Sequence, residues 1–155
     1  MWRIHGVALS DATESGVMSD VAHNLGAATF CAQDDGAVRA MRGDELLAAA
    51  DFDLLKIDVE GMELPALHGL EALISRCRPR IFIEILEPSR SEFHAWLRDH
   101  DYHVTQVFEH PDMTNFLLTP ADGRQAVVVG GGAGHAPAPE TATPDAFHRS
   151  SRHPP

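Results

Sequence analysis

Three carboxylates follow apolar segments of the chain, and they are the residues best suited to chemistry. Asp58 and Glu60 stand at the end of the apolar segment 54–59, and Glu84 lies near the end of the apolar segment 80–86. Asp58 and Glu60 are candidates for a general base, since a carboxylate with a tuned pKa can take a proton from an alcohol. They are also candidates for divalent-metal ligands, because oxygen donors suit Mg²⁺, and for binders of substrate hydroxyls. Glu60 could instead cap the next helix by accepting backbone N–H groups, and Glu84 could line the site or make a structural hydrogen bond.

A strand, a helix and a second strand must position these acids. Apolar residues recur every three or four positions through 62–77, which predicts a helix between strands at 54–59 and 80–86. Strand, helix and strand within about thirty residues form the βαβ unit of a parallel sheet. Ligands of such sheets bind just outside the carboxyl ends of the strands. We therefore expect the chemistry of this chain at the edge where the three acids lie.

Residues alternate between the two faces along the first of these strands. One face carries Leu54, Lys56, Asp58 and Glu60, and the other carries Leu55, Ile57 and Val59. Lys56 is therefore predicted to be a salt-bridge partner of the acids rather than a nucleophile. Glu63, in the first turn of the following helix, is expected to complement the positive end of the helix dipole.

Further strands are predicted on both sides of this unit. We expect a strand over 2–9, and a loop with a weak hairpin over 14–37, because that segment contains an Asp-Gly pair typical of hairpin turns. Val38–Met41 is predicted to be a short strand. The segments 102–108 and 115–119 are predicted to pair antiparallel, since no helix separates them.

Two short sequence signals predict helix caps. Asp44 is expected to cap a short helix over 45–50, which is rich in Leu and Ala. Ser89 with Glu92 three residues later forms a capping-box signature, and it predicts a helix that runs to about His100.

Composition and charge exclude several classes of partner. The 155 residues carry a net charge of −11, with no cluster of basic residues, which argues against binding nucleic acid or an anionic membrane surface. No apolar run approaches the ~18 residues of a membrane helix, and no secretory signal is visible. Cys31 and Cys77 form neither a metal spacing nor a disulfide framework, and the ten histidines complete no zinc pattern. We expect one soluble, acidic, cytoplasmic domain, with no assigned metal site.

The end of the chain differs in composition from the rest. Glycines at 130–134 and five prolines beyond them cannot supply a packed core, so 123–155 is predicted to be a linker and a disordered tail. Val127, Val128 and Val129 before the glycines imitate a nucleotide-binding turn, but that turn needs a following helix. Pro137 and Pro139 forbid one. The alternative interpretation of the run 127–134 is a circularly permuted first strand of the sheet.

The central motif and its flanks together resemble one family. Residues 55–61 read Leu-Lys-Ile-Asp-Val-Glu-Gly, and Leu67-His68-Gly69 and Arg78-Pro79 follow before the strand that ends at Glu84. This series resembles the FkbM-type methyltransferases. The segments 7–11, 44–47, 101–102 and 115–118 are similar to the family's flanking elements, so the resemblance covers about residues 2–120.

The resemblance implies a fold, a reaction and a set of residues. The fold is an α/β, Rossmann-like three-layer methyltransferase domain over 1–122. It would bind S-adenosylmethionine and methylate an oxygen of a small molecule, polyketide or sugar. The implied catalytic candidates are Asp58, Glu60 and Glu84. The implied cofactor-binding candidates are Leu9, Ser10, Asp11 and Asp58, with the turn at 9–11 near the adenine.

One part of the family's pattern has no counterpart in this sequence. The family's first strand, with its glycine-rich cofactor turn, and its second strand would precede Trp2. Without the first strand, the strand at 54–59 would keep an open apolar edge, which proteins normally avoid. Three alternatives follow: a methyltransferase, a non-catalytic remnant, or a split module whose edge pairs with a second copy or a partner chain.

Overall fold

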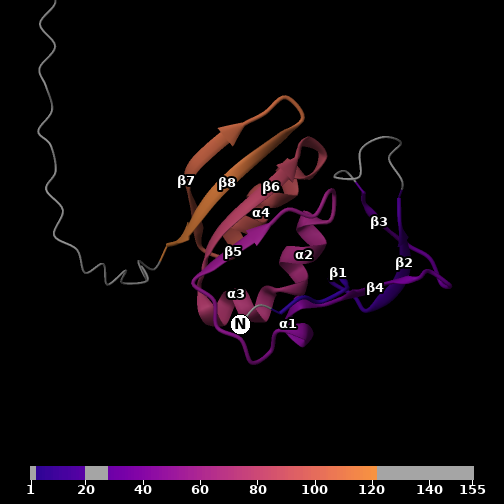
Figure 1. Cartoon of the computed structure of the whole chain (residues 1–155). Coiled ribbons are helices and arrows are strands. Elements are labelled where there is room, and N and C mark those ends of the chain that lie inside the picture. The colour runs from indigo at the N-terminus through magenta and orange to yellow at the C-terminus, as the bar shows by residue number, and fades with distance from the viewer. Residues whose placement is uncertain (1–2, 20–27, 122–155) are drawn as a thin grey trace, which may run out of the picture.

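The computed structural model describes residues 3–19 and 28–121, and these form an α/β protein with two mixed four-stranded sheets (Figure 1). The larger sheet has the order β5-β6-β8-β7. Its strands are β5 (Leu54–Ile57), β6 (Arg80–Leu86), β7 (Tyr102–Glu109) and β8 (Met113–Pro120). β5 and β6 are parallel, and β8 pairs antiparallel with both β6 and β7. The strand–helix–strand unit and the final antiparallel pair are therefore confirmed.

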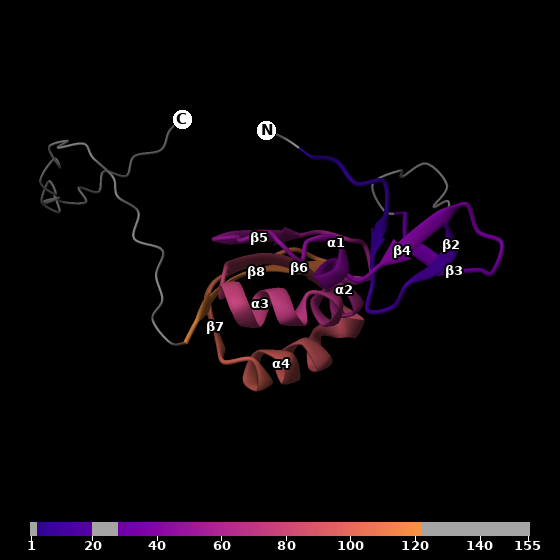
Figure 2. The same ribbon diagram turned by 90° about the horizontal axis from the view of Figure 1, so that it is seen from below.

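Three helices cover one face of this sheet: α2 (Glu63–Gly69), α3 (Glu71–Cys77) and α4 (Arg90–Asp99) (Figure 2). Their apolar faces and the inward residues of the strands form one core, in which Leu67, Ile81, Ile83 and Phe93 are fully buried. The apolar residues that recur along the predicted helix therefore pack against the sheet, as expected for one face of an amphipathic helix.

The opposite face of the larger sheet carries no helix of the described part of the chain (Figure 2). Leu54 on β5 is 58% exposed and Phe108 on β7 is 45% exposed, and Phe108 packs edge-to-face on Phe82. Two layers are therefore described where three were expected, because no apolar helix is left among these residues to cover the second face.

The predicted helix over 62–77 is two helices, and the start of the second is capped by a side chain that is distant in the sequence. The main chain breaks at Leu70, whose φ is −109°. The carboxylate of Asp44 accepts hydrogen bonds from the N–H groups of Ala72 (3.0 Å) and Leu73 (2.8 Å). The prediction that Asp44 caps its own helix was wrong, because the carboxylate satisfies the start of α3 instead. α1 itself is only Gly43–Leu46.

The second predicted cap is also absent from the structure. A short 3₁₀ turn, η2 (Glu87–Ser89), leads directly into α4, and Ser89 makes no side-chain capping bond. Its φ of −85° and ψ of −7° are helical, whereas a capping side chain needs an extended backbone.

The smaller sheet has the order β1-β4-β2-β3 and lies to one side of the larger one (Figure 1). Its strands are β1 (Ala8–Leu9), β2 (Glu14–Met18), β3 (Phe30–Ala32) and β4 (Val38–Met41). The strand at 38–41 is confirmed, but the strand expected over 2–9 is reduced to two residues, because only these pair with β4. The Asp-Gly turn joins β3 to β4, and both pair with β2 rather than with each other.

No helix of the described residues has the length and apolar character to cross a membrane. The predicted tail over 123–155 lies outside the described residues, and so do the valine and glycine runs within it.

Candidate functional site

The structure brings together the three acids that the sequence singled out. Asp58, Glu60 and Glu84 each place a carboxylate oxygen within 4.8 Å of those of the other two. Asp58 directly follows β5, and Glu84 lies on the neighbouring parallel strand β6. Because parallel strands present their carboxyl ends at one edge of a sheet, the βαβ unit is sufficient to produce this cluster.

Asp58 and Glu84 have partners that fix their side chains. Nζ of Lys56 lies 2.6 Å from Oδ2 of Asp58, so the predicted salt bridge is confirmed. Asn115 Nδ2 donates a longer hydrogen bond of 3.4 Å to Oε2 of Glu84 across the β6–β8 pair. Among the described residues, each of these bonds uses one oxygen of its carboxylate.

Glu60 differs from its two neighbours in its electrostatics. Burial raises the pKa of its carboxyl above the ordinary value of 4.5, and the negative charges of Glu84, Asp58 and Glu63 raise the pKa further. A carboxyl group with a raised pKa is a stronger base at neutral pH than an ordinary one. The cluster therefore contains one acid suited to accept a proton.

The turn that carries Glu60 has an uncommon backbone. Glu60 has a φ of +43° and Gly61 has a φ of +87°, a region that residues with a Cβ rarely occupy. Thr29 Oγ1 donates a hydrogen bond of 2.5 Å to the carbonyl oxygen of Glu60, and the N–H of Gly61 donates one of 2.6 Å to Oε1 of Glu63. Glu63 thus accepts a backbone N–H just before α2. The sequence had suggested Glu60 as the acceptor of N–H groups at the start of this helix.

Sequence reasoning missed both of these partners. Glu63 was predicted only to complement the helix dipole, although its position two residues after a glycine in the turn before a helix was a usable signal. Thr29 gave no signal, because it lies 31 residues before Glu60 and reaches it only through the fold of the smaller sheet.

A cavity of about 680 Å³ lies between the smaller sheet and the turn that follows β5. Its walls are mostly apolar; Asp58 and Glu60 are the acids that line it, and Glu84 does not line it. The residues that line it are His5, Gly6, Val7, Ala8, Leu9, Met18, Ala28, Phe30, Val38, Asp58, Val59, Glu60 and Met62. A mainly apolar cleft of this size with a few polar groups is typical of a small-molecule or cofactor site.

The predicted cofactor residues at 9–11 have different surroundings. Leu9 lines the cavity, whereas Ser10 and Asp11 do not. Ser10 is buried beneath α2, where a Cβ on Gly69 would lie 2.0 Å from the Ser10 carbonyl oxygen. Asp11 is exposed and accepts a hydrogen bond from the Ser10 hydroxyl.

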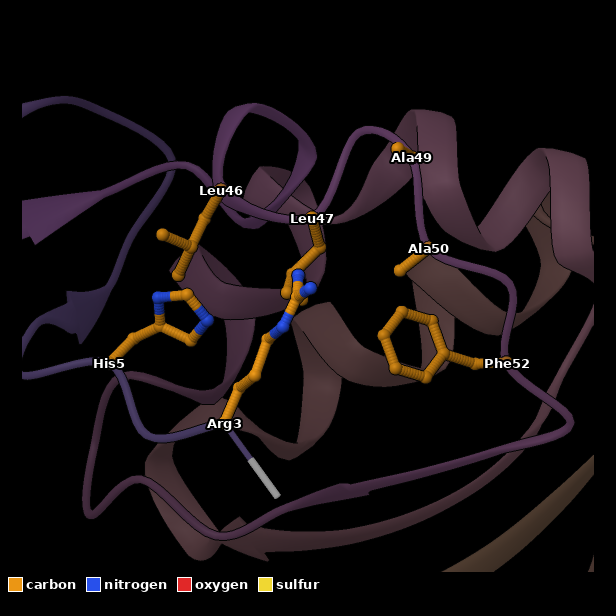
Figure 3. Close-up of a pocket in the computed structure, with 7 residues that line it drawn as sticks. All are labelled: Arg3, His5, Leu46, Leu47, Ala49, Ala50 and Phe52. Atoms are coloured by element: carbon orange, nitrogen blue, oxygen red, sulfur yellow. The ribbon is translucent and has the colours of Figure 1, made fainter. Parts of the chain in front are cut away.

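A second cavity of about 430 Å³ lies beyond the start of β5 (Figure 3). Arg3 and His5 reach into it opposite an apolar wall that includes Leu46, Leu47 and Phe52. None of the predicted site residues lines this cavity, and His5 also lines the larger one.

The three acids provide only oxygen donors, a set that suits a hard divalent cation such as Mg²⁺. Lys56 already supplies one positive charge to Asp58. The cluster is therefore able to hold a metal, and it is equally able to bind hydroxyl groups or to accept a proton.

Comparison with known proteins gives one match. A family model described as "Methyltransferase FkbM domain" matches residues 37–117, which is more than half of the chain and includes all three acids. No curated protein and no solved structure matched the chain.

Proposed function

The chain belongs to the FkbM methyltransferase family, and on that premise we propose that it uses S-adenosylmethionine to methylate an oxygen of a small molecule, polyketide or sugar. The observation that carries the proposal is that Asp58 and Glu60 line the apolar cavity. Both residues follow β5 at the carboxyl edge of a parallel strand pair, where ligands of such sheets bind.

The cavity lining has both kinds of surface that this cofactor needs. Val7, Leu9, Phe30 and Met62 offer apolar surface for an adenine ring. Asp58 and Glu60, in the same lining, offer acceptors for the cofactor's hydroxyl or ammonium groups and for the acceptor substrate. We assign Asp58 to a position beside the cofactor, and its ion pair with Lys56 fixes the carboxylate there.

The reaction needs a base at the acceptor oxygen. S-adenosylmethionine supplies the methyl carbon, and its sulfur keeps the electron pair of the broken carbon–sulfur bond. Glu60 takes the proton from the acceptor hydroxyl as the oxygen forms its bond to carbon, a role favoured by the raised pKa of this carboxyl. Glu84, whose carboxylate lies within 4.8 Å of those of Asp58 and Glu60, helps to keep that pKa raised. A divalent cation on the three acids is the alternative, in which the metal would lower the pKa of the hydroxyl instead.

The strand order favours a further proposal about the sheet. β5, β6, β7 and β8 would correspond to the fourth, fifth, sixth and closing strands of a Rossmann-like methyltransferase. Among the described residues β5 pairs only with β6, and the family's first strand would lie along the free edge of β5. We propose that a strand from a second copy or from a partner chain pairs there. A monomer in light scattering that binds the cofactor unaided would contradict this.

Isothermal titration with S-adenosylhomocysteine, the product of the cofactor, tests the proposed function. We expect micromolar binding that is lost in Asp58→Ala and kept in Glu109→Ala, which removes an exposed acid at the end of β7. A folded sample without detectable binding would contradict an independently active enzyme, and would favour the non-catalytic remnant or the split module.

A further inference from the structure

We propose that Thr29 and Glu63 are positioning residues that hold Glu60 in its left-handed conformation, so that its carboxylate meets those of Asp58 and Glu84. The inference rests on the proposed function, because it assigns both residues to that site. It also concerns backbone geometry that can be measured without any methyl transfer.

The conformation of Glu60 requires support from its surroundings. A φ of +43° is costly for a residue with a Cβ, and such strain persists only where neighbouring groups hold the backbone in place. Strained residues of this kind concentrate at functional sites. In this conformation the Glu60 carboxylate has an oxygen within 4.8 Å of those of the other two acids.

Thr29 and Glu63 hydrogen-bond to opposite sides of the same peptide group. The carbonyl oxygen of Glu60 and the N–H of Gly61 belong to one peptide plane; Thr29 Oγ1 bonds the oxygen at 2.5 Å, and Glu63 Oε1 bonds the N–H at 2.6 Å. Because the orientation of that plane sets ψ of Glu60 and φ of Gly61, fixing it from both sides fixes the turn.

Thr29 is itself held by the smaller sheet. Its N–H donates to Oγ of Ser19 at 3.0 Å, and the N–H of Ser19 donates to its carbonyl oxygen at 2.7 Å. Thr29 also packs on the turn, since a Cβ on Gly61 would lie 3.6 Å from its Cγ2. The β2–β3 hairpin therefore contributes one residue to the geometry of a site on the larger sheet.

Glu63 is unusual for a residue in the first turn of a helix. It is only 1% exposed, and its second oxygen, Oε2, is buried without a hydrogen-bond partner among the described residues. Burying a carboxylate in this way is costly. This carboxylate contributes two things to the site: it accepts the hydrogen bond from Gly61, and its negative charge raises the pKa of Glu60.

Hydrogen exchange of the Gly61 amide, followed by NMR, tests the inference with matched variants. Thr29→Val and Glu63→Met keep side-chain size and remove the hydrogen bond, whereas Thr29→Ser and Glu63→Gln keep an oxygen at each position. We expect exchange about tenfold faster or more in the first pair and near the wild-type rate in the second. Amide signals of β6 and β8 show in each variant that the fold is kept.

Titration with S-adenosylhomocysteine on the same samples connects the geometry to the site. We expect Thr29→Val and Glu63→Met to weaken binding more than Thr29→Ser and Glu63→Gln do. Unchanged Gly61 exchange in the first pair would overturn the inference, and so would equal binding in both pairs when the wild type binds. No binding by the wild type, with Gly61 exchange still sensitive to the variants, would remove the proposed function and leave the backbone role standing.

Discussion

Lys56 Nζ lies 2.6 Å from Oδ2 of Asp58; Lys56 is an exposed residue of β5, and Asp58 directly follows that strand. The two side chains are 62% and 42% exposed. Exposed ion pairs stabilise a fold only weakly, so this pair is more important for orienting Asp58 at the cavity than for stability.

Lys56→Met should therefore separate stability from binding. We expect the free energy of unfolding in urea to fall by no more than about 1 kcal/mol. The affinity for S-adenosylhomocysteine should change more, because the Asp58 carboxylate loses the charge that orients it. Lys56→Arg keeps the charge and is the control. A large loss of stability with unchanged affinity would contradict this assignment.

Gly61→Ala tests the strained turn. The added methyl group has room, with its nearest neighbour 3.6 Å away, but the φ of +87° is unfavourable for alanine. We expect a loss of about 1–3 kcal/mol in the free energy of unfolding, measured by urea denaturation. Gly6→Ala is the control, because nothing lies within 4 Å of its added Cβ; its effect should stay within about 0.5 kcal/mol. Equal effects at both glycines would be evidence against strain at the turn.

The raised pKa of Glu60 predicts how stability depends on pH. Burial and the neighbouring acids raise this pKa above 4.5 in the folded protein, so between 4.5 and the raised value the folded state binds more protons at Glu60 than the unfolded state does. The contribution of Glu60 to the free energy of unfolding therefore falls as the pH rises through that window, and it stays low above it. Glu60→Gln removes this contribution.

Urea unfolding at a series of pH values measures the effect. The stability of Glu60→Gln relative to the wild type should increase as the pH rises from 4.5 and then level off. A difference that is constant across this range would show that the pKa of Glu60 is not raised.

Asp44→Ala should weaken the start of α3. The carboxylate accepts two backbone hydrogen bonds, from Ala72 and Leu73. Loss of a cap typically costs about 0.5–2 kcal/mol, and we expect that loss in urea denaturation. Asp35→Ala, in the exposed turn between β3 and β4, is the matched control and should be nearly neutral.

Local periodicity was enough to predict the parts of the fold that position the acids. The alternation along β5 and the apolar stripe of α2 and α3 each reflect a repeat within one segment, and the parallel β5–β6 pair brings Asp58 and Glu84 together as a consequence. The predicted caps at Asp44 and Ser89 failed for different reasons: the Asp44 carboxylate bonds the start of α3, which the tertiary structure places near it, and the backbone of Ser89 is already helical.

The support for Glu60 could not be predicted in this way. Thr29 and Glu60 are joined by one hydrogen bond between segments that share no repeat or motif. The three-layer arrangement also remains a prediction, since nothing in the described sequence specifies what covers the second face of the larger sheet.

The position of Thr29 in the chain sets the order in which the site can form. Glu63 bonds Gly61, which is two residues away, so its bond closes a loop of negligible entropy cost, whereas the bond of Thr29 to Glu60 must close one of 31 residues. We expect the turn after β5 to form early with α2, and to reach its final geometry only when the hairpin docks late in folding. A ligand bound between the smaller sheet and the turn after β5 would favour the docked state, so the contact that shapes the acid cluster would also let binding shift the last folding step toward the completed site.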